Sequence, residues 1–324
     1  MYLPGSDTFM YKPPSMRRRL GRIAAWVVTV TALGWLFWKT PVSHVWSALS
    51  HAAPWTLPVV LAAAALVYLA DAFAMWKTFG WFLARLPLRD ILVVRGATYL
   101  LAVINYTIGQ GAIVYFMHRA RGVPVLRGLA TVLLIMGTNL LALLLLVTAG
   151  LALPGIHPAG LAPVVGVVWT GLALYVTLVA ARPRWLASRP VFDVLLSAGL
   201  GGHLKAMLVR LPHVAALMAV ELVALRGFGV VLPWSVALGA MPVVLLVSAL
   251  PISVQGLGTT QAAMVLFFSS YVPPTAGDPH AVVLGASLTA QTAALLFQVA
   301  TGLICLRSQT ARGLSAIRNV TRQI

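Results

Sequence analysis

Apolar residues gather in a series of long runs along this chain, and the pattern predicts helices that cross a lipid bilayer. A helix of about 20 apolar residues spans the roughly 30 Å of hydrocarbon in a membrane. The runs lie at 23–38, 55–77, 91–117, 127–150, 161–181, 204–226, 233–272 and 281–304. We therefore expect an all-α polytopic membrane protein with about six full spans.

Two of these runs, 91–117 and 233–272, are interrupted by residues that break a helix. The first contains polar residues and glycines over 105–111, and the second contains Pro251, Gly256 and Gly258. Proline lacks a backbone donor, and glycine adopts conformations closed to other residues. Broken backbone is tolerated at membrane depth only inside protein or beside a watery cavity. We predict that each run forms a re-entrant helical hairpin, with simple kinks in ordinary spans as the alternative.

The basic residues fall on alternate connections, which predicts the sidedness of the chain. Lys and Arg concentrate at the start of the chain, at its end, and in 77–95, 118–127 and 182–205. The positive-inside rule places these segments, and both termini, in the cytoplasm. Because 77–95 and 118–127 then lie on one side, the run between them must return to the face it left. By the same reasoning the 233–272 run enters from the opposite face.

The two halves of the chain match each other in inverted sense. Residues 55–150 and 204–304 both read as helix, hairpin, helix, an arrangement typical of transporters with broken helices near the midplane. We divide the chain into a cytoplasmic tail (1–19), one membrane domain (20–305) and a basic cytoplasmic tail (306–324).

Composition excludes a soluble enzyme. The chain is 60% hydrophobic and 9% charged, with a mean hydropathy of +0.93, whereas soluble domains carry about 25% charged residues. The net charge of +17 would suit nucleic acid in a soluble protein, but here the arginines lie between apolar runs and suit anionic lipid headgroups. We expect a multi-pass protein of a bacterial-type inner membrane, with membrane lipids as partners and no nucleic acid. The sequence indicates no protein partner.

Polar residues at the hairpin breaks are the best candidates for a binding site. Free helix ends and amide side chains can hold a headgroup, and arginine binds phosphate with two parallel hydrogen bonds. Arginines just beyond a hairpin can equally be positive-inside anchors. The candidate headgroup-binding residues are Asn105, Gln110, Arg119, Arg121, Gln255, Gly256, Gly258 and Gln261.

Asp71 and Glu221 are possible intramembrane charges, which are costly and usually face a bundle interior. We place both within about two turns of a helix end, where interfacial water lowers the cost, and a structural role stays open for each. No metal-ligand spacing or nucleotide-binding motif appears. We therefore expect no metal, no cofactor and no catalytic residue.

The second break also carries a family resemblance. Residues 250–263, LPISVQGLGTTQAA, resemble the pattern LPISIGGLGVREAA of the lysylphosphatidylglycerol synthase transmembrane-region family, also called flippase-like. Residues 104–122 are similar to that family's earlier N-x-x-x-P-x-x-x-G-E segment. Thr260 and Gln261 stand where the family pattern has Arg and Glu. The resemblance covers most of 20–305, without the soluble aminoacyl-transferase domain, so lysyl transfer is not expected.

The resemblance implies a flippase-like membrane protein that binds, and translocates, an amphipathic phospho- or isoprenoid lipid. The hairpin tips would hold the headgroup, and the tails would stay in the bilayer. One alternative is an intramembrane lipid-modifying enzyme, for which Asp71, Glu221, His118 and His213 are the available acids and bases. Another is a non-catalytic scaffold of a lipid or polysaccharide pathway.

Overall fold

The computed structural model describes residues 16–104, 106–152, 161–249 and 252–321, and within these ranges it contains helices and no strand. Three short 3₁₀ turns, η1 (Val254–Gly256), η2 (Ser269–Tyr271) and η3 (Pro274–Ala276), flank α11 and precede α12. The α-helices are α1 (Met16–Lys39), α2 (Val42–Ser50), α3 (Thr56–Phe82), α4 (Leu88–Ile104), α5 (Tyr106–Arg121), α6 (Val125–Leu151), α7 (Leu161–Ala181), α8 (Arg184–Ala187), α9 (Pro190–Gly227), α10 (Trp234–Ala249), α11 (Thr259–Phe268) and α12 (Pro279–Thr321).

The lengths of the apolar helices confirm a multi-pass membrane protein. Within the described residues, four helices are long and apolar enough to cross a bilayer: α3, α6, most of α9, and α12 up to Arg307. The pair α1 and α2, bent by 81°, would make a fifth span. Helices α7 and α10 are shorter apolar helices. The expected count of about six spans therefore remains a prediction.

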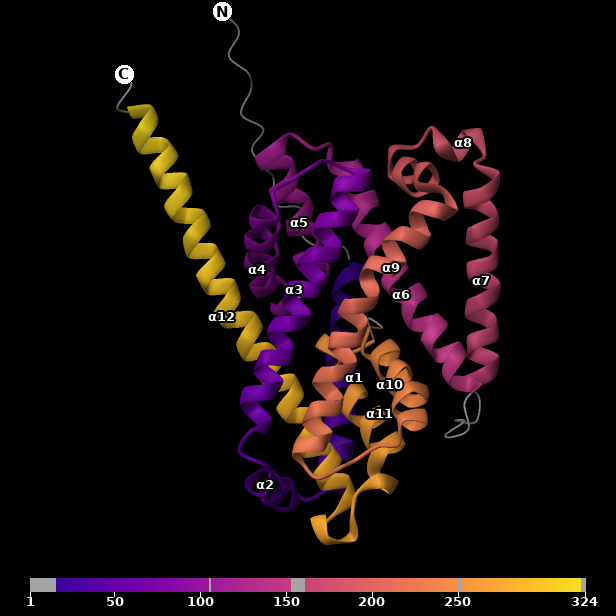
Figure 1. The fold of residues 1–324 in the computed structure, drawn as a ribbon, viewed down its shortest axis with the longest axis vertical. Coiled ribbons are helices and arrows are strands. Elements are labelled where there is room, and N and C mark those ends of the chain that lie inside the picture. Colours follow the sequence, from indigo (N-terminus) through magenta and orange to yellow (C-terminus); the bar gives the residue numbers. More distant parts are fainter. Residues whose placement is uncertain (1–15, 105, 153–160, 250–251, 322–324) are drawn as a thin grey trace, which may run out of the picture.

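Each half of the bundle places two short helices between two long ones (Figure 1). Helices α4 and α5 form a pair in the upper half of the view, between α3 and α6 in the sequence. Helices α10 and α11 form a pair in the lower half, between α9 and α12. We call these pairs the first hairpin and the second hairpin. Their joined ends point toward each other at the middle of the molecule.

Each hairpin packs into its own apolar core. The first core joins α3, α4, α5 and the upper part of α6, and Ile91 and Ile113 are fully buried in it. The second core joins α9 to α12 with the lower part of α6, around Met241, Met264 and Leu284. Helices α3 and α6 contribute to both cores and so join the two halves.

Small residues allow the closest helix contacts. A Cβ added to Gly109 of α5 would lie 2.6 Å from the Cβ of Ala102 on α4, and one added to Gly150 of α6 would lie 2.6 Å from the Cα of Gly239 on α10. Lipid tails are as apolar as the side chains, so helices in a membrane associate mainly through close packing. These glycines therefore set the spacing within the first hairpin and between α6 and the second hairpin.

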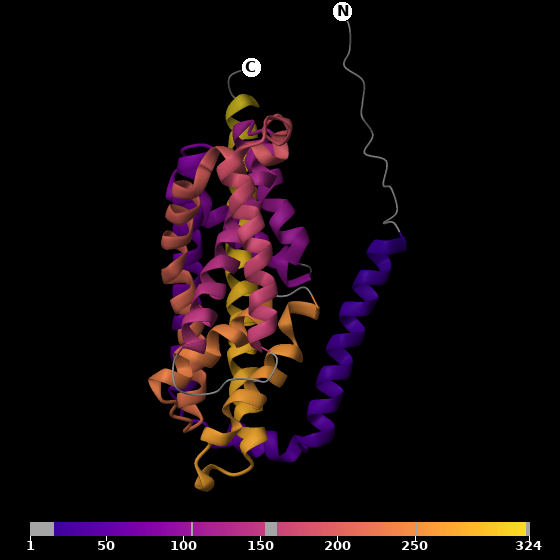
Figure 2. The ribbon, with the colours of Figure 1, turned by 90° about the vertical axis from the view of Figure 1, so that its right-hand side faces the viewer.

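Helix α1 runs beside the bundle and joins it at the lower end through α2 (Figure 2). Its contacts with the bundle include the turn that precedes α11. The Val254 backbone N–H donates to the Thr29 hydroxyl at 2.8 Å, and a Cβ on Gly258 would lie 2.8 Å from the Cβ of Ala32. The first helix is therefore tied to the second hairpin.

The basic 182–205 segment, expected as a cytoplasmic connection, is largely helical. It contains α8 and the first turns of α9, which bends at Gly199 where φ is 59°. Positive φ is readily available to glycine, so this residue lets α9 turn before it descends through the bundle.

Candidate functional site

A hydrogen bond joins the two hairpins where their ends meet. The side-chain Nε2 of Gln255, in the turn before α11, donates to the backbone carbonyl of Ala102 near the end of α4. The last four carbonyls of a helix have no intrahelical partner, and Ala102 is among them because α4 ends at Ile104. A side chain of the second hairpin thus caps the end of a helix in the first.

Gln255 adopts a backbone conformation that side chains usually avoid. Its φ is 55° and its ψ is 26°, in the left-handed region, which costs a non-glycine residue roughly 1–2 kcal/mol. The family pattern has glycine at this position. The carbonyl of Gln255 also lies 3.4 Å from Nε2 of Gln291 on α12, which donates to it. Contacts at both its side chain and its carbonyl hold this residue in the strained turn.

Gln261 organises the start of α11 from inside the bundle. Its side chain is fully buried. Its Oε1 accepts the Gly258 backbone N–H at 2.7 Å, and its Nε2 donates to the Ser287 hydroxyl of α12 at 3.3 Å. The amide that replaces the family's glutamate therefore makes both a helix cap and an interhelical bond.

Hydroxyl groups surround Gly256 in the same turn. The hydroxyls of Ser253 and Thr259 lie 2.8 Å apart. A Cβ on Gly256 would meet the hydroxyl oxygens of Thr260 at 2.6 Å and Ser248 at 2.9 Å. The Thr260 hydroxyl is buried and has no hydrogen-bond partner among the described residues. The absence of a side chain at Gly256 therefore leaves room for a polar cluster.

Gln110 belongs to the same region. It is half-buried and follows Gly109, the residue that packs against Ala102. Its backbone is therefore one residue from the close contact between Gly109 and Ala102. The residues of the expected site that the structure gathers in this region are Gln110, Gln255, Gly256, Gly258 and Gln261.

Other expected site residues lie apart from this contact or outside the description. Arg119 is exposed on α5, about 15 Å along the helix from Gly109 toward its far end. Asn105 lies outside the described residues, and so does the side chain of Arg121. Of the two arginines expected in the site, the one whose side chain is described, Arg119, is therefore not part of the tip region.

A second polar site, missed from the sequence as a cluster, forms around Asp71 of α3. The Asp71 side chain is 1% exposed. Arg210 of α9 donates from Nη1 to Oδ1 at 2.5 Å, and Arg95 of α4 donates from Nε to Oδ2. One carboxylate therefore links three helices, with one oxygen serving each guanidinium. We call these three residues the charge cluster.

The position of the charge cluster corrects two expectations. Asp71 lies eleven residues, about three turns, before the end of α3 at Phe82, because α3 continues past the apolar run to residue 82. The positive-inside rule predicts Arg95 to lie in the cytoplasmic 77–95 segment, yet it is buried, as is Arg210. Arg95 also lies over the Tyr99 ring, 4.9 Å from its centroid. A lone carboxylate inside an apolar run was the available signal, because such a charge needs a partner.

His213 of α9 adjoins the charge cluster, three residues from Arg210, but its Nδ1 lies within hydrogen-bond distance of the Val67 carbonyl, at 3.3 Å. Glu221 is partly buried, and its Oε2 has no hydrogen-bond partner among the described residues. It lies eleven residues, about 16 Å along α9, from Arg210. The Asp71 carboxylate is itself engaged by both arginines.

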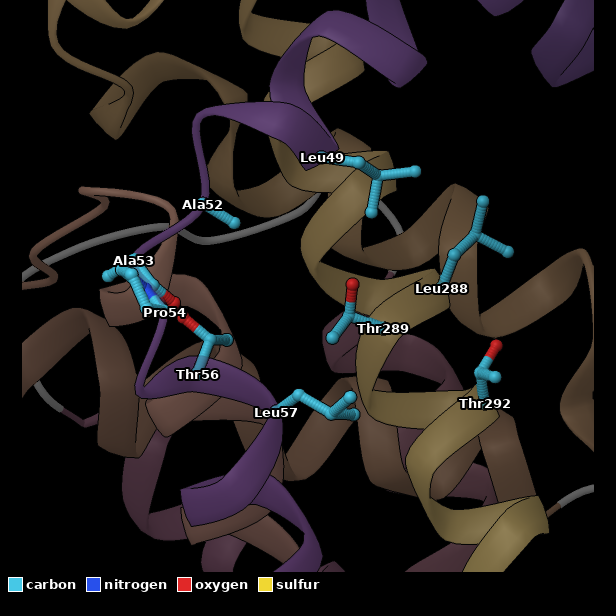
Figure 3. Close-up of a pocket in the computed structure, with 9 residues that line it drawn as sticks. All are labelled: Leu49, Ala52, Ala53, Pro54, Thr56, Leu57, Leu288, Thr289 and Thr292. Carbon is cyan, nitrogen blue, oxygen red and sulfur yellow. Dashed lines mark hydrogen bonds between the residues drawn. The ribbon is translucent and has the colours of Figure 1, made fainter.

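A cavity of about 480 Å³ lies between the start of α3 and α12 (Figure 3), and Thr56 in its wall is about 22 Å along α3 from Asp71. Its wall contains no ionisable side chain, and the Thr56 and Thr289 hydroxyls donate to backbone carbonyls. We assign no chemistry to it. The lining residues are Leu49, Ala52, Ala53, Pro54, Thr56, Leu57, Leu288, Thr289 and Thr292.

The fold and its two polar sites define a polytopic α-helical membrane protein with paired helical hairpins. Residues 22–302 match the family model described as the lysylphosphatidylglycerol synthase TM region. The chain belongs to this family, which links it to lipid biology. A search of curated proteins and a search of solved structures each found no match.

Proposed function

We propose that the protein binds an amphipathic lipid at the meeting point of its two hairpins and moves the headgroup across the membrane. The bond from Gln255 to the Ala102 carbonyl carries this proposal. It places amides, hydroxyls and helix ends together midway along an apolar bundle. Polar, irregular backbone survives at that depth where it lines a site for a substrate or ion.

Exposed tryptophans support a membrane placement in which the hairpins are re-entrant. Tryptophan favours the two membrane–water interfaces. Trp55 and Trp81, at opposite ends of α3, are separated by 26 residues, or about 39 Å, which encloses about 30 Å of hydrocarbon. The other exposed tryptophans near the two ends of the bundle are Trp38, Trp46 and Trp234 below and Trp185 above.

Basic residues support the same orientation. Arg85, Arg89, Arg119 and Arg184 belong to the upper end in Figure 1, where α4 begins and α5 ends. We take that end as cytoplasmic by the positive-inside rule. The first hairpin then enters from the cytoplasm and the second from the opposite face. Both termini are cytoplasmic in this arrangement, in a bacterial-type inner membrane.

Movement of one half against the other would expose the headgroup site to each face in turn. The two hairpins pack in different apolar cores, which meet along α3 and α6. Gln255 bridges the halves, so its bond to Ala102 would form and break during the cycle. The lipid tails would remain in the surrounding bilayer.

Headgroup translocation in liposomes tests this proposal. We expect Gln255→Leu, and the double change Gln255→Leu with Gln110→Leu, to lower the rate at least about tenfold, because each leucine removes hydrogen-bonding groups from the site. Thr170→Leu is the control, since Thr170 is an exposed polar residue on α7 whose hydroxyl donates to the Gly166 carbonyl of the same helix. Unchanged transport in the double variant, with the control also unchanged, would exclude the site.

A further inference from the structure

The charge cluster holds more positive than negative charge. Asp71 carries one negative charge, and it serves both Arg95 and Arg210. The whole chain has six acidic residues. Asp193 and Asp278 pair with other side chains, Glu221 lies three turns away on α9, Asp90 lies in the first turn of α4, five residues before Arg95, and Asp7 falls outside the described residues. Two buried guanidiniums that share one carboxylate are costly, because a net charge is unfavourable in an apolar interior.

Arg210 also has a hydrogen-bond donor that lacks an acceptor among the described residues. Its side chain is 7% exposed, and Nη1 is bound to Asp71. Its Nε is buried and finds no acceptor among the described residues. Arginine carries five N–H donors in a planar fork that matches two oxygens of a phosphate. A donor therefore remains available beside an excess of positive charge.

We propose that Arg95 and Arg210 form an anion site for a phosphate group that bears one negative charge, with Asp71 as the residue that positions both guanidiniums. One added negative charge balances the cluster, and Nε of Arg210 donates to a phosphate oxygen. Each carboxylate oxygen of Asp71 binds one arginine, and this fixes the positions of the two guanidiniums relative to each other. The chemistry fits a phosphodiester headgroup or inorganic phosphate.

The site's location connects it to the hairpins. Arg95 lies about 10 Å along α4 from the start of that helix at Leu88, and Ala102, the partner of Gln255, is two turns further on. The cluster is closed in this conformation, and a shift of α4 away from α3 and α9 would open it. The inference rests on the proposed function for the idea that a lipid headgroup reaches this depth.

Ligand-dependent thermal stability of the purified full-length protein tests the anion site. The probes are phosphatidylglycerol, diacylglycerol with the same acyl chains, and inorganic phosphate, each added to the detergent-solubilised protein. We expect phosphatidylglycerol to stabilise the wild type and diacylglycerol not to do so. In Arg210→Gln the apparent affinity should fall about tenfold or more.

Arg210→Gln is a favourable variant because it leaves Asp71 and Arg95 as a balanced pair. Arg226→Gln, at an exposed position on the same helix, is the control and should keep wild-type affinity within about twofold. If Arg210→Gln does not fold, Arg95→Gln tests the same site, since it leaves Asp71 and Arg210 balanced. Equal affinity in the folded arginine variant and the wild type would overturn the proposal, as would equal stabilisation by diacylglycerol.

The inorganic phosphate arm separates the two sources of the ligand. Competition by inorganic phosphate would assign recognition to the phosphate group itself, and stabilisation by phosphatidylglycerol alone would assign it to a membrane headgroup; either supports the site.

Translocation assays distinguish a failure of the anion site from a failure of the proposed transport function. Normal lipid binding by Arg210→Gln beside lost transport in Gln255→Leu would reject the anion site alone. Lost binding in Arg210→Gln without any wild-type transport would reject the proposed function alone.

Discussion

The side chain of Gln255 donates to the backbone carbonyl of Ala102, and this bond connects the second hairpin to the first. To make this bond, Gln255 adopts a left-handed backbone conformation that is unfavourable for a residue with a side chain. Two substitutions separate the side-chain bond from the backbone strain. Gln255→Leu loses the bond and keeps the strain, whereas Gln255→Gly loses the bond and relieves the strain.

We expect Gln255→Leu to destabilise the protein by about 1 kcal/mol, the usual worth of one hydrogen bond. Gln255→Gly should be close to wild type, because relief of about 1 kcal/mol of backbone strain offsets the lost bond. Thermal unfolding in detergent measures both. A glycine variant less stable than the leucine variant would contradict the assigned conformation. Both variants should lose transport, because both lose the amide.

Two glycines on α5 provide a matched test of the first hairpin. A Cβ at Gly109 would lie 2.6 Å from the Ala102 Cβ and 2.8 Å from its Cα, whereas one at Gly111 would meet nothing within 4 Å. We expect Gly109→Ala to destabilise the protein by about 1–3 kcal/mol through overpacking. Gly111→Ala should be neutral or stabilising, because alanine favours a helix. The same thermal assay checks both, and equal effects would argue against the α4–α5 contact.

Asp71 should be the acidic residue whose loss is most damaging. Asp71→Asn removes the carboxylate that pairs with both buried arginines, and breaking a buried pair costs about 3–5 kcal/mol. Asp193→Asn is the comparison, because Asp193 and Arg127 are about half-exposed and 3.9 Å apart; we expect about 0–1 kcal/mol there. Unfolding in denaturant measures the difference. Similar losses of unfolding free energy in the two variants would show that the charge cluster does not stabilise the fold more than a surface ion pair does.

Asp278, at the lower end of the bundle, should make the stability of the fold depend on pH. Partial burial opposes ionisation, but hydrogen bonds from His44 and from the backbone N–H groups of His280 and Ala281 outweigh it and lower the pKa of Asp278. A lowered folded-state pKa stabilises the fold above the ordinary carboxyl value of about 3.9, and this contribution is lost as the pH falls through the lowered value.

We therefore expect the thermal midpoint of the wild type to fall more than that of Asp278→Asn when the pH drops from about 6 to about 3. The asparagine variant cannot ionise at this position, so it should lack this part of the response. His44→Ala should reduce the response, because it removes the 3.1 Å contact to Oδ2. Parallel curves for wild type and Asp278→Asn would contradict the assigned hydrogen bonds.

Hydropathy and helix-breaking residues predict much of this fold. The runs at 127–150 and 161–181 match α6 and α7 within about two residues. The glycines of the two interrupted runs indicate where each run divides into two helices. These features are local, because span length and helix breaks depend on residues close together in the sequence.

The charge cluster could not be assembled from the sequence for the opposite reason. Arg95 and Arg210 lie 24 and 139 residues from Asp71; Arg95 ends a basic segment that the positive-inside rule explains, and Arg210 lies within the apolar run 204–226. Their partnership depends on how α4 and α9 pack against α3. The bond from Gln255 to Ala102 likewise spans 153 residues and depends on the two hairpins meeting.

Accessibility of single cysteines in whole cells tests the central claim, that the hairpins enter the membrane from opposite faces. In a Cys305→Ser background, Arg89→Cys and Arg119→Cys mark the two outer ends of the first hairpin, and Val231→Cys and Thr275→Cys flank the second. These four positions are exposed. With a membrane-impermeant maleimide we expect the first two to be protected in intact cells and the last two to be labelled. Labelling of Arg89→Cys and Arg119→Cys from opposite faces would show a full crossing and contradict the account.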